Sequence, residues 1–183
     1  MRLPGGSIAT PLVSMVSVGL VLVAGCARDD PNRVAPDGAP FSFQLPTSFT
    51  QQPALADRTK AGAAATTHAA AVAIDVYNTI TVLSFPLDQD ASTLSDGELV
   101  RQLAPVVRTL TTTQRRVSAV QRRDVKAGRA MYLRILDNGT SQASDLYFIF
   151  AGRSEVEVAC QWQDKPKAVA NGCQAVLDSL RVG

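Results

Sequence analysis

The sequence predicts an α+β domain in which an antiparallel β-sheet of about six to seven strands is flanked by helices. Residues 117–162 contain four strand-like segments joined by short turns, which is typical of an antiparallel meander. Residues 95–110 and 173–180 instead repeat apolar side chains at helical spacing. Because a sheet and an amphipathic helix each bury an apolar face, the helices are expected on the faces of the sheet.

The N-terminus is predicted to be a lipoprotein signal peptide over residues 1–25. Arg2 gives it a positive start, residues 8–23 are mostly apolar and uncharged, and a small-residue site precedes Cys26. The segment Val-Ala-Gly-Cys ending at Cys26 resembles a bacterial lipobox, in which this cysteine carries lipid. The alternative is a retained transmembrane helix, since roughly 20 apolar residues span a bilayer. The lipobox predicts a cell-membrane protein, lipid-anchored at Cys26 on the extracytoplasmic face.

The mature chain is predicted to consist of a tether and one domain. Residues 26–40 hold the lipidated cysteine and a run rich in proline and charge, which is typical of a flexible linker. Fully extended, this tether reaches on the order of 45 Å. Residues 41–183 are long enough for a single domain with its own core.

The first half of the domain is predicted to contain strands. Residues 41–45 alternate apolar and polar side chains up to Pro46, which predicts a first strand. Residues 50–70 have no clear period, and residues 67–74 form either a strand or an irregular crossing. Residues 77–85 are rich in β-branched residues and are predicted to form a strand, with a turn at 75–78 before it.

A capped helix follows these strands. Ser95 and Glu98 have the spacing of a capping box, and apolar residues recur from Leu99 to Leu110 at helical intervals. Pro105 interrupts this pattern. Either the helix kinks at Pro105, or a second helix begins there.

The meander is predicted in four steps. A strand over 117–123 turns at 126–128 into a second strand over 129–136. Asn138-Gly139 then indicates a type I′ hairpin turn, because both residues tolerate positive φ angles. Residues 146–150 are apolar on both faces, which predicts a central strand. Residues 155–162 place valines, a cysteine and Trp162 on one face and polar side chains on the other.

The cysteines predict one disulfide. With Cys26 lipidated, Cys160 and Cys173 remain as a pair. Cys160 lies on the apolar face of a strand, and Cys173 lies on the apolar face of the last helix, with Val176 and Leu177 at helical spacing. Export permits disulfides, so a bond is expected to fasten this helix to the sheet and to add very roughly 3 kcal/mol. The alternative is two buried free thiols.

Several short motifs carry a family resemblance over most of residues 41–183. They are the lipobox at Cys26, the segment 41–46, the strand 78–82, the turn 128–130, and the C-terminal pieces 158–160 and 172–182. With these motifs the chain resembles actinobacterial cell-envelope lipoproteins of the LpqN type, which look like members of the PsbP-like, Mog-type fold. The resemblance implies an α/β/α sandwich and a non-catalytic envelope protein that acts by binding. The chain departs from it at Phe49, where many relatives carry tryptophan, and in the alanine-rich stretch 61–71.

Two candidate catalytic or metal sites have structural explanations. His68 is the only histidine and has no cysteine or carboxylate near it in the sequence, so we expect a structural role rather than a catalytic or metal role. Asp88, Asp90 and Ser92 have the spacing of a calcium loop. The expected glycine and glutamate are replaced by threonine and leucine, which favours a polar loop before the capped helix.

The candidate binding site is a set of basic residues on neighbouring strands, several of which could share one surface or edge of the sheet. It could hold an anionic lipid, an acidic wall polymer or an acidic protein partner. The alternative is a solvated sheet edge that uses charge against aggregation. The cluster consists of Arg115, Arg116, Arg122, Arg123, Lys126, Arg129 and Arg134.

A second candidate site is an apolar cavity between sheet and helix. Its lining would come from large side chains that otherwise simply form the core. These side chains are Phe148, Phe150, Val158, Trp162 and Leu180.

The function predicted from the sequence is a membrane-anchored, non-catalytic binding or accessory module of the cell envelope. It would hold a partner protein or a lipid during envelope assembly or transport. The alternative is a carrier with a lipid or a small apolar ligand in an internal cavity. The sequence shows no nucleophile–base pair, so no enzyme and no cofactor are expected. A net charge of +2 and the lack of aromatic-rich basic motifs argue against a nucleic-acid partner.

Overall fold

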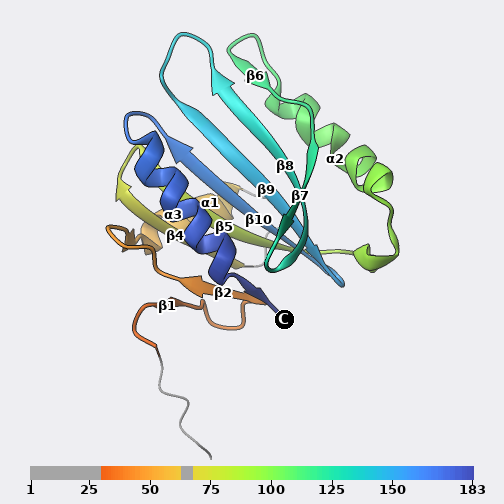
Figure 1. Ribbon diagram of the computed structural model, residues 1–183, viewed down its shortest axis with the longest axis horizontal. Coiled ribbons are helices and arrows are strands. Elements are labelled where there is room, and N and C mark those ends of the chain that lie inside the picture. The colour runs from red at the N-terminus through yellow and green to blue at the C-terminus, as the bar shows by residue number, and fades with distance from the viewer. Residues whose placement is uncertain (1–29, 63–67) are drawn as a thin grey trace, which may run out of the picture.

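The computed structural model describes residues 30–62 and 68–183 (Figure 1). The predicted signal peptide and Cys26 lie outside these residues. The described part contains an eight-stranded antiparallel sheet in the order β3-β4-β5-β10-β9-β8-β6, with β7 also paired to β8. A smaller sheet has the order β1-β2-β11. The predicted α+β class is therefore confirmed.

The bounds of the elements are as follows. The larger sheet consists of β3 (Thr50–Gln51), β4 (His68–Asp75), β5 (Asn78–Pro86), β6 (Arg115–Val117), β7 (Gln121–Val125), β8 (Gly128–Asp137), β9 (Ala143–Ala151) and β10 (Ser154–Trp162). The smaller sheet consists of β1 (Arg33–Val34), β2 (Phe41–Gln44) and β11 (Arg181–Val182). The helices are α1 (Pro53–Gly62), α2 (Asp96–Leu110) and α3 (Pro166–Ser179), with a short 3-10 turn η1 (Ala91–Thr93) before α2.

Strand alternation divides the core into two apolar layers. On one face, which we call the α3 face, Val156 and Val158 of β10 lie in one cluster with Val176 of α3. On the opposite face, the α2 face, Phe148 of β9 lies in a second cluster with Leu99 of α2. Helix α3 runs across the sheet in Figure 1, and α2 lies beside β6 and β8. The fold is therefore layered, with the large sheet between helices.

The C-terminal meander forms as the alternation predicts. Strands β8, β9 and β10 pair in sequence, and β10 also pairs with β5. Strand β9 is central, with Phe148 buried on one face and Ile149 buried on the other. The predicted disulfide between Cys160 and Cys173 is also confirmed, with an S–S distance of 1.99 Å. It joins the buried face of β10 to the buried face of α3.

Helix α2 is a single helix with the predicted cap. The Ser95 Oγ accepts a hydrogen bond from the Glu98 N–H, and the Glu98 carboxylate accepts one from the Ser95 N–H at 2.7 Å. Pro105 lies inside the helix, so no second helix begins there. None of the described helices has the length and apolar character needed to cross a bilayer.

Two details of the meander differ from the prediction. The strand expected over 117–123 is split into β6 and β7, and at the break Ser118 exchanges hydrogen bonds with the main chain of Arg134. The prediction of a type I′ turn at Asn138-Gly139 is also wrong. Gly139 has a φ of 81°, but Asn138 has no positive φ, and the Asp137 N–H donates across a longer loop to the Gln142 carbonyl.

Part of the segment predicted as a tether pairs with the domain, and most of the ambiguous region folds. Residues 33–34 form β1 against β2, because Val34 is apolar and enters the core with 5% exposure. Within residues 50–75, helix α1 forms over Pro53–Gly62 and strand β4 over His68–Asp75. Helix α1 buries only Ala56 among its residues, which explains why no amphipathic period was visible.

Candidate binding pocket on the α3 face

The seven basic residues proposed as one patch lie on two faces of the sheet. Arg122 and Arg129 stand opposite Met131 and Phe150 in the strand register, which places them on the α2 face. Arg129 donates to the carbonyls of Leu94 and Ala91 at 2.8 and 2.7 Å. These two arginines therefore connect the start of α2 to the sheet.

Ion pairs also neutralise Arg122, and they remove one more member, Arg115, from the predicted patch. Arg122 bonds to the carboxylates of Asp96 and Asp124, both at 3.0 Å. Arg115 bonds to Asp137 at 2.8 Å near the β8–β9 hairpin. Arg116 is exposed and stands opposite Leu136, nearer the β8–β9 hairpin than the remaining three residues. The seven residues therefore do not all share one surface, because adjacent residues of a strand point to opposite faces.

Arg123, Lys126 and Arg134 do come together, in a pocket of about 360 Å³ beside α3. We call it the tyrosine pocket, because the rings of Tyr132 and Tyr147 lie in its wall. Strands β7, β8 and β9 supply one side, and α3 supplies the other. Its lining residues are Arg123, Asp124, Val125, Lys126, Tyr132, Arg134, Asp145, Tyr147, Gln174, Leu177 and Asp178.

The two tyrosines form an aromatic pair across neighbouring strands. Tyr132 and Tyr147 are directly opposed in the β8–β9 register, with ring centroids 5.1 Å apart. The guanidinium of Arg123 lies 5.3 Å from the Tyr132 centroid, which is a cation–π distance. Burial, followed by the hydrogen bond that Tyr132 donates to Asp145, raises the pKa of Tyr132 to about 12. Burial also raises the pKa of Tyr147, so both phenols stay protonated at neutral pH.

Arg134 is a structural part of the pocket wall rather than a free charge. Its guanidinium donates two hydrogen bonds to the Asp145 carboxylate, at 2.6 and 2.8 Å. The same guanidinium lies 5.5 Å from the ring centroid of Trp162. The bonds to Asp145 hold the pKa of Arg134 above its usual range. Because Asp145 neutralises it, Arg134 has little charge left for a ligand.

Two cations in the tyrosine pocket have no carboxylate partner among the described residues. Arg123 donates only to the Gln121 side chain, at 3.3 Å, and Lys126 has no hydrogen-bond or ion-pair partner there. One carboxylate, Asp178, accepts from the Gln174 amide and has no cation partner in the described chain. The other two carboxylates of the lining are paired, Asp145 with Arg134 and Asp124 with Arg122, so the pocket offers two available cations, one unpaired carboxylate and two aromatic rings. This set suits the binding of an anionic group, and the lining contains no histidine or cysteine.

The predicted apolar cavity does not form among the described residues. Phe148 and Phe150 belong to the cluster under α2, whereas Val158 and Leu180 belong to the cluster under α3. The sheet separates the two groups, so they cannot line a common space. Trp162 is partly buried at the end of β10, next to Arg134. Sequence reasoning placed these side chains correctly in the core but could not assign them to faces.

Asp90 and His68, the two residues considered for metal or catalytic chemistry, lie in separate parts of the fold, before η1 and at the start of β4. The Asp90 carboxylate accepts from the Ser92 N–H at 2.8 Å and begins η1. The His68 Nδ1 atom is buried and has no hydrogen-bond partner in the described part of the chain. In residues 30–62 and 68–183, no group of three or more histidine, cysteine or carboxylate side chains is arranged to hold a metal ion.

One pair of polar residues was missed by the sequence analysis. Glu155 and Glu157 lie on the α2 face of β10, where alternation predicts polar side chains but does not predict burial. Burial raises the pKa of Glu155 to about 7. Burial, and then the charge of Glu155, raises the pKa of Glu157 to about 7. Their burial could have been predicted from the central position of β10 in a sheet that helices cover on both faces.

Comparison with known proteins identifies the class of fold. The chain is similar to CyanoP, the cyanobacterial PsbP of Synechocystis sp. PCC 6803, with a TM-score of 0.58 and 12% identity over 82% of this chain and 91% of that one. It is also similar to a protein from Bacteroides thetaiotaomicron VPI-5482, with a TM-score of 0.54 and 12% identity. That alignment covers 83% of this chain and 48% of the other, so the chain spans about half of that protein.

These likenesses define a PsbP-like fold, as the sequence motifs led us to expect. No protein-family model matches the chain, and no curated protein sequence matches it.

Proposed function

We propose that the protein is a bacterial lipoprotein, anchored by lipid at Cys26 on the extracytoplasmic face of the cell membrane, whose PsbP-like domain is a non-catalytic binding module. The lipobox ending at Cys26 supports the anchor. The Cys160–Cys173 bond supports export, because disulfides persist in oxidising compartments. The chain's likeness to CyanoP supports a binding rather than a catalytic domain.

We further propose kinship with envelope lipoproteins of the LpqN type. The support comes from the motifs at residues 41–46, 78–82 and 172–182 together with the PsbP-like fold. On this proposal, the domain holds a partner protein or a lipid during envelope assembly or transport.

The tyrosine pocket is the observation that carries the binding function. Arg123 and Lys126 provide positive charge beside two aromatic rings, on a part of the sheet next to α3. An anionic group is the ligand that this arrangement favours, whether it belongs to a lipid headgroup, a wall polymer or an acidic protein segment. The anchor would add to modest affinity by raising the local concentration of membrane partners.

A carrier of lipid in an internal cavity is the second candidate, and it has less support. A carrier needs an enclosed apolar space on the order of 300 Å³ or more. The large apolar side chains of this protein instead fill two layers on opposite faces of the sheet. Native mass spectrometry of the full chain separates the two proposals: an added mass that extracts into organic solvent would favour the carrier.

The anchor is tested by changing the cysteine. In a bacterial host that exports lipoproteins, the wild-type chain is expected to incorporate labelled palmitate and to sediment with membranes. The Cys26→Ala variant should lose the label and remain unprocessed. The double variant Cys160→Ala/Cys173→Ala is the matched control and should keep the label. Labelling of Cys26→Ala would disprove the anchor.

The pocket is tested with soluble anionic probes on the full chain in a neutral detergent. Glycerophosphoglycerol and a hexaglutamate peptide stand for a lipid headgroup and an acidic protein, and glycerophosphocholine, a zwitterion with no net charge, is the reference. At least one anionic probe should shift the amide resonances of residues around Tyr132 and Tyr147. We expect Arg123→Ala to weaken this binding about tenfold, corresponding to about 1.4 kcal/mol, and Arg116→Ala to leave it unchanged. Equal effects of the two substitutions would reject the pocket as the site.

A further inference from the structure

The outer edge of β4 is only partly covered by its neighbour β3. Thr50 pairs with Ala73 and Gln51 pairs with Val72, and the Gln52 N–H donates to the Ala71 carbonyl at 2.8 Å. The chain then turns into α1. The first residues of β4, 68–70, therefore have β5 on one side and no strand on the other side among the described residues.

The strand register shows which main-chain groups face this open edge. In an antiparallel ladder, the hydrogen-bonding groups of successive residues point to opposite sides. The Ala71 carbonyl points toward β3, so the groups of Ala69 and Ala71 point outward and those of Ala70 point to β5.

Three of these outward groups have no hydrogen-bond partner in the described chain. They are the N–H and the carbonyl of Ala69 and the N–H of Ala71. The Gln52 carbonyl, which could have served Ala71, accepts from Leu55 and Ala56 instead. Ala71 is only 4% exposed, and unpaired main-chain groups are costly at such positions.

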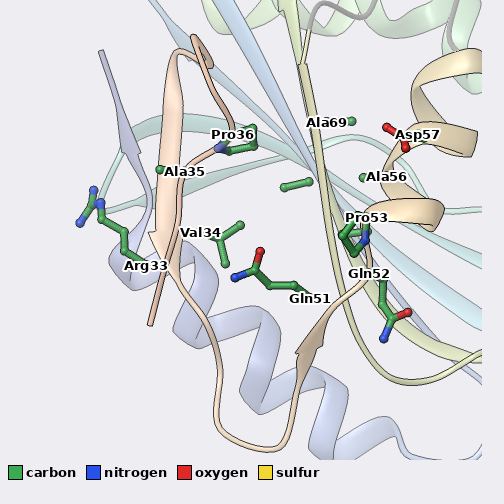
Figure 2. Close-up of a pocket in the computed structure, with 12 residues that line it drawn as sticks. Arg33, Val34, Ala35, Pro36, Gln51, Gln52, Pro53, Ala56, Asp57 and Ala69 are labelled. Carbon is green, nitrogen blue, oxygen red and sulfur yellow. The ribbon is translucent and has the colours of Figure 1, made fainter. Parts of the chain in front are cut away.

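The unpaired groups open onto a pocket of about 280 Å³, which Figure 2 shows between α1 and the N-terminal strand. We call it the edge pocket. Figure 2 places Asp57 and Ala56 of α1 on one side, and Ala35 and Pro36 on the other. Most of its lining residues are small or are proline, so another backbone has room to approach β4. The complete lining is Arg33, Val34, Ala35, Pro36, Gln51, Gln52, Pro53, Ala56, Asp57, Ala69, Ala70 and Ala71.

We propose that the edge pocket binds an extended peptide segment of a partner protein, which adds to β4 as a short strand. The open edge presents a donor and an acceptor at Ala69 and a donor at Ala71, which is the pattern that a peptide main chain completes. A lipid tail or a sugar ring does not supply alternating donors and acceptors at strand spacing. The rim carries one charge of each sign, Arg33 and Asp57, so its charge matches a segment with no net charge and small side chains.

The edge pocket would add a second site to the proposed binding module. The edge pocket and the tyrosine pocket share no lining residue. One site can therefore fail its test while the other passes.

The test begins with selection of random 12-residue peptides displayed on phage, using the full chain in a neutral detergent as bait. Enriched peptides are synthesised, and their affinity is measured by fluorescence anisotropy. We expect peptides with small, uncharged side chains at the paired positions. Hydrogen exchange should slow at the amides of Ala69 and Ala71 when such a peptide is bound. Failure to enrich any peptide, or protection only around Tyr132, would overturn the proposal.

Two variants separate main-chain pairing from side-chain contact. Ala69→Pro removes an outward N–H at an edge position, where proline is tolerated, and should weaken peptide binding at least tenfold. Ala69→Val keeps that N–H and should change the affinity less than threefold. Thermal melts show whether each variant is folded.

A chemical control in the peptide does not depend on the stability of the protein. N-methylation of every second peptide residue removes the donors that face one side of the added strand. Methylation in one register should abolish binding, and methylation in the other should leave most of it. Equal effects of the two registers, or unchanged binding by Ala69→Pro, would contradict strand addition.

Discussion

At the scale of single residues, Gly172 shows how closely α3 approaches the sheet. A Cβ atom at this position would lie 2.5 Å from Phe49 Cε2 and 3.2 Å from Ile80 Cδ1. Both distances are shorter than ordinary van der Waals contact. Phe49 is itself 5% exposed, so its ring has little room to move. The small residue is needed for packing, since no positive φ is involved.

Gly172→Ala is therefore expected to destabilise the protein by about 1–3 kcal/mol, because the added methyl overpacks the interface. Denaturant unfolding at constant pH measures this change. Gly97→Ala is the matched control in α2, where the nearest atom is 3.8 Å away, and it should stabilise by up to about 1 kcal/mol through helix propensity. Equal stabilities of the two variants would contradict the close approach of α3 to Phe49.

Asn78 is the main buried polar residue that joins separate segments. Its amide donates to Asp75 at 2.7 Å and to Asp164 at 2.8 Å, and its Oδ1 accepts from the N–H groups of Gln163 and Lys165. The side chain is fully buried and ties the β4–β5 turn to the loop before α3. Its two donors and its acceptor are all used.

Asn78→Ala should cost about 2–4 kcal/mol, because it leaves two main-chain donors and two carboxylates without this partner. Urea unfolding is the measurement. Asn138→Ala is the control and should cost less than about 1 kcal/mol, because this exposed side chain makes one hydrogen bond, to the Thr113 carbonyl. A small effect at Asn78 would show that water replaces its bonds.

Glu155 and Glu157 predict an unusual dependence of stability on pH. Each has a folded-state pKa of about 7, above the ordinary value of 4.5, so the folded protein binds more protons than the unfolded chain. Their contribution is complete below about pH 4.5 and is lost as the pH rises through 7. Over this interval the pair should lower the free energy of unfolding by an amount on the order of 2–4 kcal/mol.

The measurement is the melting temperature between pH 5 and 8, which should fall as the pH rises. Glu155→Gln/Glu157→Gln should flatten this profile, because amides do not titrate. Carboxylates with lowered pKa values, such as those of Asp75 and Glu98, act in the opposite direction and only at more acidic pH. A flat profile in the unmodified protein would show that water or a cation reaches the pair.

At the scale of elements, the disulfide connects the last helix to the middle of the sheet. Removing it with Cys160→Ala/Cys173→Ala should destabilise the domain by very roughly 3 kcal/mol, chiefly by releasing a constraint on the unfolded chain. Reduction of the wild-type protein should have a similar effect, measured by denaturant unfolding with and without reductant. If reductant shifted the transition of the double variant as well, its effect would not come from this bond.

The elements that could be predicted are those whose local signals agree with their packing. Helix α2 combines a capping box with a clear apolar stripe, and β10 alternates strictly because one face lies under α3. Helix α1 could not be predicted, since it rests on small residues and buries only Ala56. The split between β6 and β7 had no local signal either, because it depends on the hydrogen bonds between Ser118 and Arg134.

The tyrosine pocket was only partly predictable for a similar reason. Arg123, Lys126 and Arg134 stand out in the sequence by charge. Their separation from Arg122 and Arg129 follows from strand alternation, but it required the correct register of β7. The contribution of α3 through Gln174 and Asp178 depends on tertiary packing, which a strand pattern does not contain.

At the scale of the whole molecule, the main sheet separates two faces whose charged side chains are used differently. On the α2 face, charged side chains such as Arg129 bind main-chain carbonyls and hold the helix in place. On the α3 face, beyond the helix, Arg123 and Lys126 remain available. The edge pocket lies at the opposite end of the strand order, beside β3 and β4. A partner could therefore occupy one site without blocking the other.

The pairing of β1 with β2 changes how far this protein can act from a membrane. If Cys26 carries the lipid, only residues 27–29 separate it from Asp30, whose carboxylate accepts a hydrogen bond from the Gln44 amide of β2 at 2.7 Å. Four Cα–Cα steps span at most about 14 Å, roughly a third of the reach expected for a tether of 15 residues. The domain would then lie against the lipid headgroups, and its rotation would be restricted. It could not reach far into the cell wall above the membrane. Its binding partners would have to be embedded in the same bilayer or be able to reach the bilayer surface.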